Sequence, residues 1–178
     1  MDIGIYGGSF NPVHFGHIGL AQWTVQHTDL DELWMLVTPS NPLKDPNILA
    51  DEQQRLHAVE QAILQSACGN VVKASDFEFH LPRPSYTANT LRQLQLSYPQ
   101  HRFTLIIGED NVDIFPRWRE YEYILDHFRI FVYPRRGSQG LDSIRTLMDT
   151  DQSTIRNIVY LHDAPYFDVS STQLRTQQ

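Results

Sequence analysis

Two histidines three positions apart, in the tetrapeptide His14-Phe15-Gly16-His17, constrain this chain more than any other feature. They follow an apolar segment, residues 3–6, and a double glycine, Gly7-Gly8. A helical pattern begins directly after them, with Ile18, Ala21 and Val25 on one face. A strand, a glycine turn and a helix in this order predict the opening of a βαβ unit. The glycines would let a bulky ligand approach the backbone, and a helix N-terminus attracts phosphate.

The histidine pair differs from the common nucleotide-binding motifs, because G-x-G-x-x-G and the P-loop pattern are both absent from this segment. At helical spacing, His14 and His17 share one face. Two imidazoles aimed at one point can donate N–H groups to an oxyanion that gains charge during a reaction. The alternative is that the histidines only cap the helix or pack against it.

The segment G-G-S-F-N-P-V-H-F-G-H resembles the signature of the H-x-G-H nucleotidyltransferase superfamily, and F-N-P before the first histidine is similar to the nicotinate mononucleotide adenylyltransferases. The resemblance implies transfer of the adenylyl group of ATP to nicotinate mononucleotide, giving deamido-NAD and pyrophosphate in NAD biosynthesis. It implies nucleotide-bound Mg²⁺ and no metal site built from side chains. For ATP binding it implies Gly7, Gly8, Ser9, Phe10, His14 and His17, with Ser9 also near the mononucleotide.

A second motif, S-S-T-Q-L-R, lies near the C-terminus. Ser170 and Gln173 have capping-box spacing, which predicts a terminal helix from about residue 170. The chain continues for only three residues after Arg175, so we expect this helix to be short. The motif is similar to the superfamily's second signature, which implies that it holds the β- and γ-phosphates of ATP through Ser170, Ser171, Thr172 and Arg175. An ordinary capped helix is the alternative.

Three further positions match the family's patterns. Lys44 lies in a polar loop after the second expected strand and is similar to a family lysine that faces phosphate; a solvated loop lysine is the alternative. Thr87, in S-Y-T-A-N-T-L, is expected to begin a helix and, by resemblance, to receive the nicotinate carboxylate, or else only to cap the helix. Trp118 would stack on the pyridine ring, unless it is a core residue. The resemblance therefore implies catalytic roles for His14, His17, Lys44 and Arg175, and mononucleotide contacts by Ser9, Lys44, Thr87 and Trp118.

The segment I-I-G-E-D-N resembles the family's I-I-G-x-D-N, which implies that Gly108 and Asp110 contribute to ATP binding. Glu109 stands where the family usually has a small residue and receives no role. After the next strand the family often has R-P-G, whereas this chain has Pro134-Arg135-Arg136-Gly137. We assign the ATP contact to Arg135, with Arg136 as the alternative.

Strand-like and helix-like patterns alternate along the whole chain, with apolar strand segments at residues 33–37, 71–74, 103–107, 130–133 and 158–161. Alternation of this kind predicts an α/β fold with a parallel sheet, whose ligands bind beyond the carboxyl ends of the strands. The resemblance implies a Rossmann-like open sheet of about five strands in the order 3-2-1-4-5, with helices on both faces. The length of 178 residues predicts a single domain, 1–178.

The composition narrows the function classes. The net charge of −7 argues against non-specific nucleic-acid binding. The single cysteine, the absence of a signal-peptide pattern and the lack of a long apolar segment predict a cytoplasmic protein with no membrane partner. Whether the protein forms a homo-oligomer stays open. Two other functions also stay open: another H-x-G-H enzyme, such as a phosphopantetheine adenylyltransferase or a cytidylyltransferase, and a non-catalytic nucleotide sensor.

Overall fold

The computed structural model of the chain describes residues 1–39, 52–135 and 157–166. The described residues form two compact units, Met1–Ser85 and Tyr86–Tyr166. Both units are built from parallel strands and helices that alternate along the chain.

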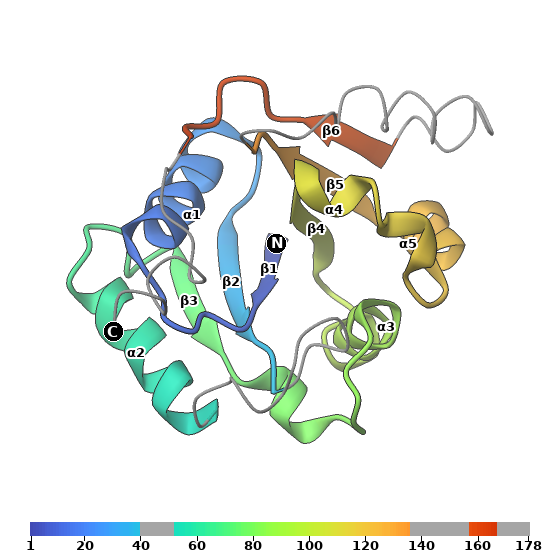
Figure 1. Cartoon of the computed structure of the whole chain (residues 1–178), viewed down its shortest axis with the longest axis horizontal. Coiled ribbons are helices and arrows are strands. Elements are labelled where there is room, and N and C mark those ends of the chain that lie inside the picture. The colour runs from blue at the N-terminus through green and yellow to red at the C-terminus, as the bar shows by residue number, and fades with distance from the viewer. Residues whose placement is uncertain (40–51, 136–156, 167–178) are drawn as a thin grey trace. The chain divides into compact units, whose positions relative to one another are not determined.

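The first unit contains three parallel strands in the order β3-β2-β1, which Figure 1 shows side by side. They are β1 (Asp2–Gly8), β2 (Glu32–Val37) and β3 (Val72–Ser75). Their side chains are largely buried, and α1 (Phe15–His27) and α2 (Glu52–Leu64) contact β2, β3 and each other. In the register of these strands Gly7 pairs with Leu36 and Leu36 pairs with Ser75. The loops that follow the three strands therefore leave from one edge.

The second unit has the parallel order β4-β5-β6. It runs through α3 (Thr87–Ser97), β4 (Arg102–Gly108), α4 (Glu109–Val112), a 3-10 turn (Phe115–Arg117), α5 (Tyr121–His127), β5 (Arg129–Tyr133) and β6 (Ile158–Tyr160). β4 is buried over residues 103–108, as its apolar sequence predicts. Gly108 pairs with Tyr133, so β4 and β5 also end at a common edge.

Three details of the first unit differ from the sequence-based expectation. Gly7 and Gly8 form no turn, because they are the last residues of β1 and pair with β2. Thr24, rather than Val25, is fully buried on α1, and its hydroxyl donates to the Leu20 carbonyl at 2.8 Å. The spacing of Leu56, Val59 and Ile63 predicts the inner face of α2. In the structure the buried face holds Arg55 together with Val59 and Ile63, while Leu56 is only half-buried.

The predicted Rossmann-like α/β fold is confirmed. The strand orders within the two units agree with the 3-2-1 and 4-5 halves of the predicted order. The described residues contain six strands rather than about five, because β6 adds a strand beside β5. The single-domain assignment stays a prediction. No helix in the described ranges has both the length and the apolar character needed to cross a membrane.

Candidate functional site

The two histidines of the H-x-G-H segment form the N-terminal cap of α1. His14 is the N-cap residue, and its Nδ1 accepts a hydrogen bond from the Gly16 backbone N–H at 3.2 Å. The Nδ1 of His17 accepts from the backbone N–H of His14, also at 3.2 Å. The pair thus forms a capping box in which both side-chain acceptors are imidazoles. The predicted common face is confirmed, because the two rings stack with centroids 3.6 Å apart.

Capping determines which imidazole nitrogen carries the proton. A ring nitrogen that accepts a hydrogen bond has no proton, so in a neutral ring the other nitrogen has it. Both Nδ1 atoms accept from backbone N–H groups, so both rings are neutral with the proton on Nε2. The capping interpretation and the oxyanion interpretation are therefore compatible. The cap uses Nδ1, and Nε2–H is the donor suited to a phosphate oxygen.

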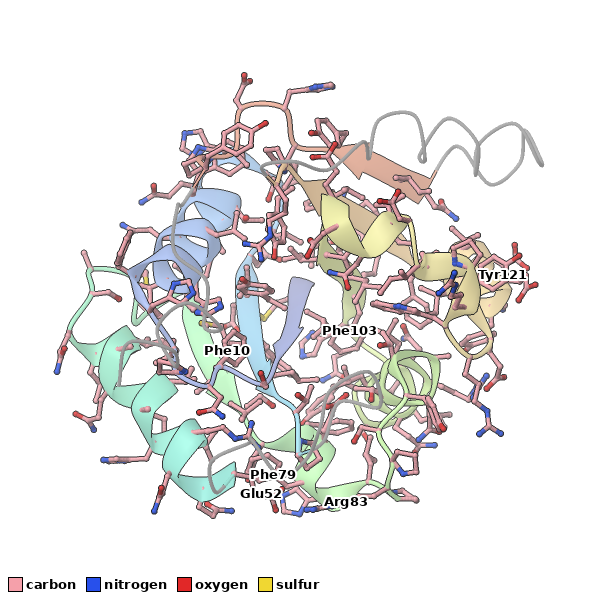
Figure 2. The ribbon with its side chains drawn as sticks, in the orientation of Figure 1. Phe10, Glu52, Phe79, Arg83, Phe103 and Tyr121 are labelled. Atoms are coloured by element: carbon pink, nitrogen blue, oxygen red, sulfur yellow. The ribbon has the colours of Figure 1, made fainter. Side chains whose placement is uncertain are left out.

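Phe10 holds the ring of His17 from the side. Its side chain is buried, and its ring meets the imidazole of His17 edge to face, with centroids 5.1 Å apart and an interplanar angle of 89°. Figure 2 labels Phe10 among the core side chains of the first unit. The backbone of Phe10 has φ 46°, a left-handed conformation that is uncommon for a residue with a large side chain. This conformation lets the chain turn sharply after β1 while the phenyl ring points back toward the protein.

The two glycines at the end of β1 have different surroundings. A Cβ on Gly8 would come within 3.1 Å of the Phe10 ring, so any larger residue there would require the ring to shift. A Cβ on Gly7 would meet no atom of the described residues within 4 Å. Packing among the described residues therefore does not explain Gly7, whereas close approach of a ligand to the backbone would.

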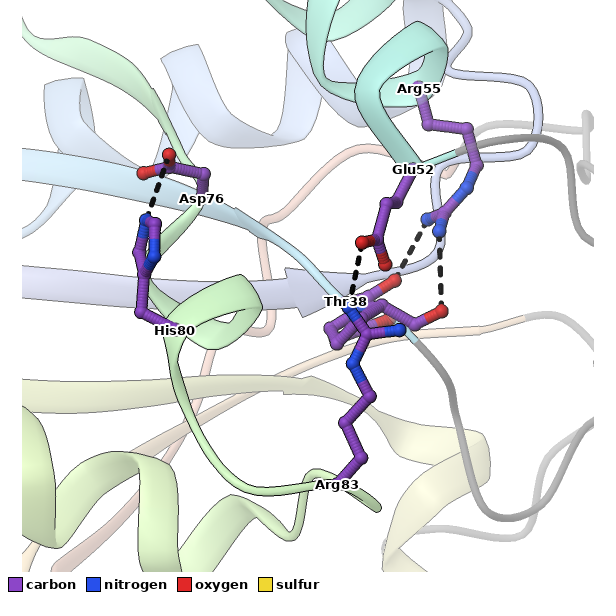
Figure 3. Close-up of polar contacts among 7 residues, drawn as sticks. Thr38, Glu52, Arg55, Asp76, His80 and Arg83 are labelled. Atoms are coloured by element: carbon purple, nitrogen blue, oxygen red, sulfur yellow. Dashed lines mark hydrogen bonds and ion pairs between the residues drawn. The ribbon is translucent and has the colours of Figure 1, made fainter.

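Arg55 is a buried cation that joins the loops after β1 and β2. Its side chain is 3% exposed, and one guanidinium nitrogen, Nη1, donates to the carbonyl oxygens of Ser9 at 2.7 Å and Thr38 at 2.8 Å. Nη2 donates to the carbonyl of Pro39 at 3.4 Å. Figure 3 shows Arg55 reaching from α2 toward Thr38. The guanidinium thus fixes Ser9 in the loop that leads to the histidines.

Sequence reasoning missed Arg55, although one signal was present. Arg55, Val59 and Ile63 are spaced by four residues, and this spacing places all three on one face of a helix. An arginine on the same helix face as two core residues either extends to solvent at the edge of that face or is buried against oxygen acceptors. The carbonyls that decide between these outcomes lie in loops distant in the sequence.

In the second unit, three of the predicted residues lie together beyond β4 and β5. Gly108 ends β4, and a Cβ there would overlap the Oδ1 atom of Asp110 and come within 3.1 Å of the Tyr133 ring. The Oδ1 atom of Asp110 is also 3.5 Å from the Nε atom of Arg135. The side chains of Asp110 and Arg135 are both partly exposed. The structure therefore groups Gly108, Asp110 and Arg135. Their assignment to the nucleotide stays a prediction.

The N-terminus of α3 suits an anionic group. Thr87 is the first residue of α3, as predicted, while Tyr86 occupies the N-cap position and provides no side-chain hydrogen bond. Thr87 itself is therefore not the cap residue. The first backbone N–H groups of a helix point outward, where the helix dipole favours negative charge. A carboxylate could accept from them and from the Thr87 hydroxyl.

Trp118 is half-buried and directly follows the 3-10 turn. Its indole packs on the ring of Phe115 with centroids 5.2 Å apart. Among the described residues, the indole N–H has no hydrogen-bond acceptor. Buried Trp N–H groups usually have a partner, so this side chain is not fully explained as a core residue.

Several predicted residues lie outside the described residues, and their predicted positions are untested: Lys44, Arg136, Ser170, Ser171, Thr172 and Arg175. Asp51, whose spacing with Gln54 predicts a capping box, also lies outside the described residues. Within residues 1–39, 52–135 and 157–166, no group of three or more His, Cys, Asp or Glu side chains could hold a metal ion. Magnesium fits this arrangement when the nucleotide phosphates and water supply most of its ligands.

The sequence is similar to a known family over nearly its whole length. The cytidylyltransferase-like family model matches residues 5–177. A probable nicotinate-nucleotide adenylyltransferase of Flavobacterium psychrophilum is 42% identical over 175 residues, covering 98% of this chain and 85% of that protein. The equally named protein of Bacteroides fragilis is 44% identical over 172 residues, covering 97% and 79%.

The structure is similar to a solved enzyme with a more distant sequence. Nicotinic acid mononucleotide adenylyltransferase of Plasmodium falciparum, solved in complex with NaAD, superimposes with a TM-score of 0.77. The match covers 98% of this chain and 82% of that one, at 18% identity. At this identity the likeness supports the shared fold.

Proposed function

We infer the function from one premise: this chain belongs to the cytidylyltransferase-like family and, within it, to the nicotinate-nucleotide adenylyltransferases. The enzyme transfers the adenylyl group of ATP to nicotinate mononucleotide, yielding deamido-NAD and pyrophosphate. The observation that best supports an active catalytic site is the imidazole capping box, because it gives both histidines an Nε2–H donor at the start of a helix.

The reaction needs no protein base. The 5′-phosphate of nicotinate mononucleotide is already an anion, and one of its oxygens attacks the α-phosphorus of ATP. The bond from that phosphorus to the bridging oxygen of the β-phosphate breaks, and pyrophosphate leaves with the bond's electron pair. Catalysis then consists of positioning the two phosphates and stabilising the charge that develops.

We assign the charge stabilisation to groups from both ends of the chain. His14 and His17 donate from Nε2 to ATP phosphate oxygens, with His17 nearest the α-phosphate. Gly7, Gly8, Ser9 and Phe10 offer backbone at the end of β1, where a Cβ on Gly7 would touch none of the residues that the structure describes. Lys44, Arg175 and the hydroxyls of Ser170, Ser171 and Thr172 neutralise the departing pyrophosphate. Bound Mg²⁺ would add positive charge beside the same phosphates.

The preference for nicotinate over nicotinamide is assigned to α3 and Trp118. The uncapped N-terminus of α3, with Thr87 as its first residue, can accept a carboxylate. A neutral carboxamide lacks the charge that this position favours. The indole of Trp118 offers a flat face for the pyridine ring. The cytoplasmic location, the absence of nucleic-acid and membrane partners, and the oligomeric state stay predictions.

A substrate panel tests this function. Each reaction contains the enzyme, MgATP and one acceptor: nicotinate mononucleotide, nicotinamide mononucleotide, phosphopantetheine or phosphocholine. The measured quantity is the rate of pyrophosphate release. We expect the highest kcat/KM with nicotinate mononucleotide. Preference for phosphopantetheine or for another phosphate would assign the chain to a different H-x-G-H activity. ATP binding without pyrophosphate release from any acceptor would support the sensor instead.

A further inference from the structure

Glu109 is a buried carboxylate for which the proposed reaction has no use. It follows the last residue of β4 directly and is 5% exposed. Acidic side chains are rarely buried this deeply without partners. The position therefore requires an explanation in terms of what the carboxylate contacts.

Glu109 is hydrogen-bonded to the segment that follows β5 and lies near the end of β6. Its Oε2 atom accepts a hydrogen bond from the backbone N–H of Arg135 at 3.1 Å, two residues after the last residue of β5. Tyr160, the last residue of β6, lies close enough that the charge of Glu109 contributes, after burial, to raising the pKa of its hydroxyl. The carboxylate thus faces two segments that are 25 residues apart in the sequence, counting from Arg135 to Tyr160.

The hydrogen bond from the Arg135 backbone N–H to Glu109 fixes the point from which the Arg135 side chain extends. The guanidinium of Arg135 lies over the Tyr133 ring, 5.9 Å from its centroid, and its Nε atom is 3.5 Å from Asp110. Asp110 is the residue after Glu109 on the short helix α4. Two adjacent carboxylates therefore act on one arginine, Glu109 on its backbone and Asp110 on its side chain.

We propose that Glu109 is a positioning residue for the nucleotide, which holds the start of the loop after β5 so that Arg135 is presented to ATP. This proposal rests on the proposed adenylyltransfer function and on the assignment of Arg135 to ATP. Glu109 touches no reacting atom in this scheme, because its carboxylate faces the Arg135 backbone and Tyr160.

The chemistry of the two partners accounts for an acid at this position. A backbone N–H and a phenol O–H are both donors, and an ionised carboxylate is the side chain that offers acceptors only. Glutamine has the same shape but carries one amide NH₂ group, which would face one of the two donors. Glu109→Gln therefore weakens the connection with little change in volume, and Tyr160→Phe removes the contact to β6 alone.

The test compares Glu109→Gln and Tyr160→Phe with wild type. Steady-state kinetics gives the KM values, and thermal melting gives the stability. Calorimetric titration with ATP in EDTA, without nicotinate mononucleotide, gives the Kd for ATP. We expect Glu109→Gln to raise the KM and the Kd for ATP by about tenfold, the usual effect of losing a hydrogen bond to a charged group. The KM for nicotinate mononucleotide should change less than about twofold, because its assigned contacts lie elsewhere. Tyr160→Phe should raise the ATP constants in the same direction but by less, because it leaves the hydrogen bond between Glu109 and the Arg135 backbone in place.

A cycle with Arg135→Ala separates positioning from a general loss of stability. If Glu109 acts through Arg135, adding Glu109→Gln to Arg135→Ala raises the ATP Kd no further. The matched control is Glu120→Gln, which changes an exposed glutamate of the same unit paired with Arg92 at 2.8 Å. It should leave both ATP constants unchanged.

Two results overturn the proposal. The first is an unchanged ATP Kd in both Glu109→Gln and Tyr160→Phe, whatever their melting temperatures. The second is full additivity of Glu109→Gln and Arg135→Ala. Failure of the proposed function gives a different result, because wild type would then release no pyrophosphate from MgATP and nicotinate mononucleotide.

Discussion

The imidazole of His14 stacks on that of His17, and the backbone N–H of His14 donates to Nδ1 of its partner at 3.2 Å. This relationship makes the local fold and the proposed chemistry depend on the same two rings. Each ring uses its Nδ1 atom to stabilise the helix start, and we propose that its Nε2–H group donates to a phosphate of ATP. Substitutions that mimic one nitrogen at a time can separate these roles.

His17→Asn and His17→Gln form such a pair. The asparagine side chain reaches about as far as Nδ1, so it can keep the cap but offers no donor at the Nε2 position. We expect kcat to fall by about 100- to 1,000-fold, as for loss of one oxyanion donor. The change in unfolding free energy should stay within about 1 kcal/mol. Glutamine reaches toward Nε2 and should retain more activity. Equal activity of the His17→Asn variant and wild type in a pyrophosphate-release assay would contradict the role of His17.

Arg55→Met should both destabilise the protein and impair turnover. The substitution leaves the buried carbonyls of Ser9 and Thr38 without their charged donor, at a cost of about 3 kcal/mol. For a chain of this size, Tm should fall by about 6 to 12 °C. Arg83→Met is the matched control, because Arg83 pairs with Glu52 at 2.7 Å but its side chain is 51% exposed. Figure 3 shows both arginines. The control should cost less than about 1 kcal/mol, and similar Tm losses for both variants would refute the special role of Arg55.

Trp118→Ala should weaken nicotinate mononucleotide binding much more than ATP binding. Loss of a stacking face costs about 1 to 3 kcal/mol, which is roughly 5- to 150-fold in the mononucleotide KM. Trp118→Phe keeps an aromatic ring next to Phe115 and should lose less. If both substrates lose affinity equally, Trp118 serves the core and the stacking assignment fails.

Alkaline pH should reveal the connection between Tyr160 and Glu109. Burial, followed by the charge of Glu109, raises the pKa of Tyr160 to about 12 from its ordinary value of 10.0. The folded protein thus keeps a proton that the unfolded chain releases. The resulting stabilisation is complete below about pH 10 and is lost as the pH rises from about 10 to about 12.

Thermal melts of wild type and Tyr160→Phe between about pH 8 and pH 11.5 provide the measurement. Phenylalanine does not titrate, so the variant's Tm should decline less steeply above about pH 10. Parallel declines of the two curves would show that the Tyr160 proton does not contribute to this pH dependence.

Local patterns in the sequence predicted the elements with short-range causes. Spacing and hydrophobicity within a few residues predict the helix that begins at Thr87 and the common face of the H-x-G-H histidines. They also predict the buried strand β4, although its observed bounds are slightly wider than the predicted 103–107. The failures have long-range causes. Gly7 and Gly8 favour turns in isolation, but pairing with Leu36 and Val37 keeps them in β1.

The sequence by itself determined the α/β fold, the family and the pair of imidazoles to which we assign the catalytic role, because strand and helix periods and a contiguous motif are properties of neighbouring residues. Only the tertiary structure decided that Arg55 is buried against two loops and that the Glu109 carboxylate accepts from the Arg135 backbone. These outcomes depend on where a donor finds its acceptor in space. Spacing along the chain carries no information about carbonyl groups and N–H groups that come together only after folding.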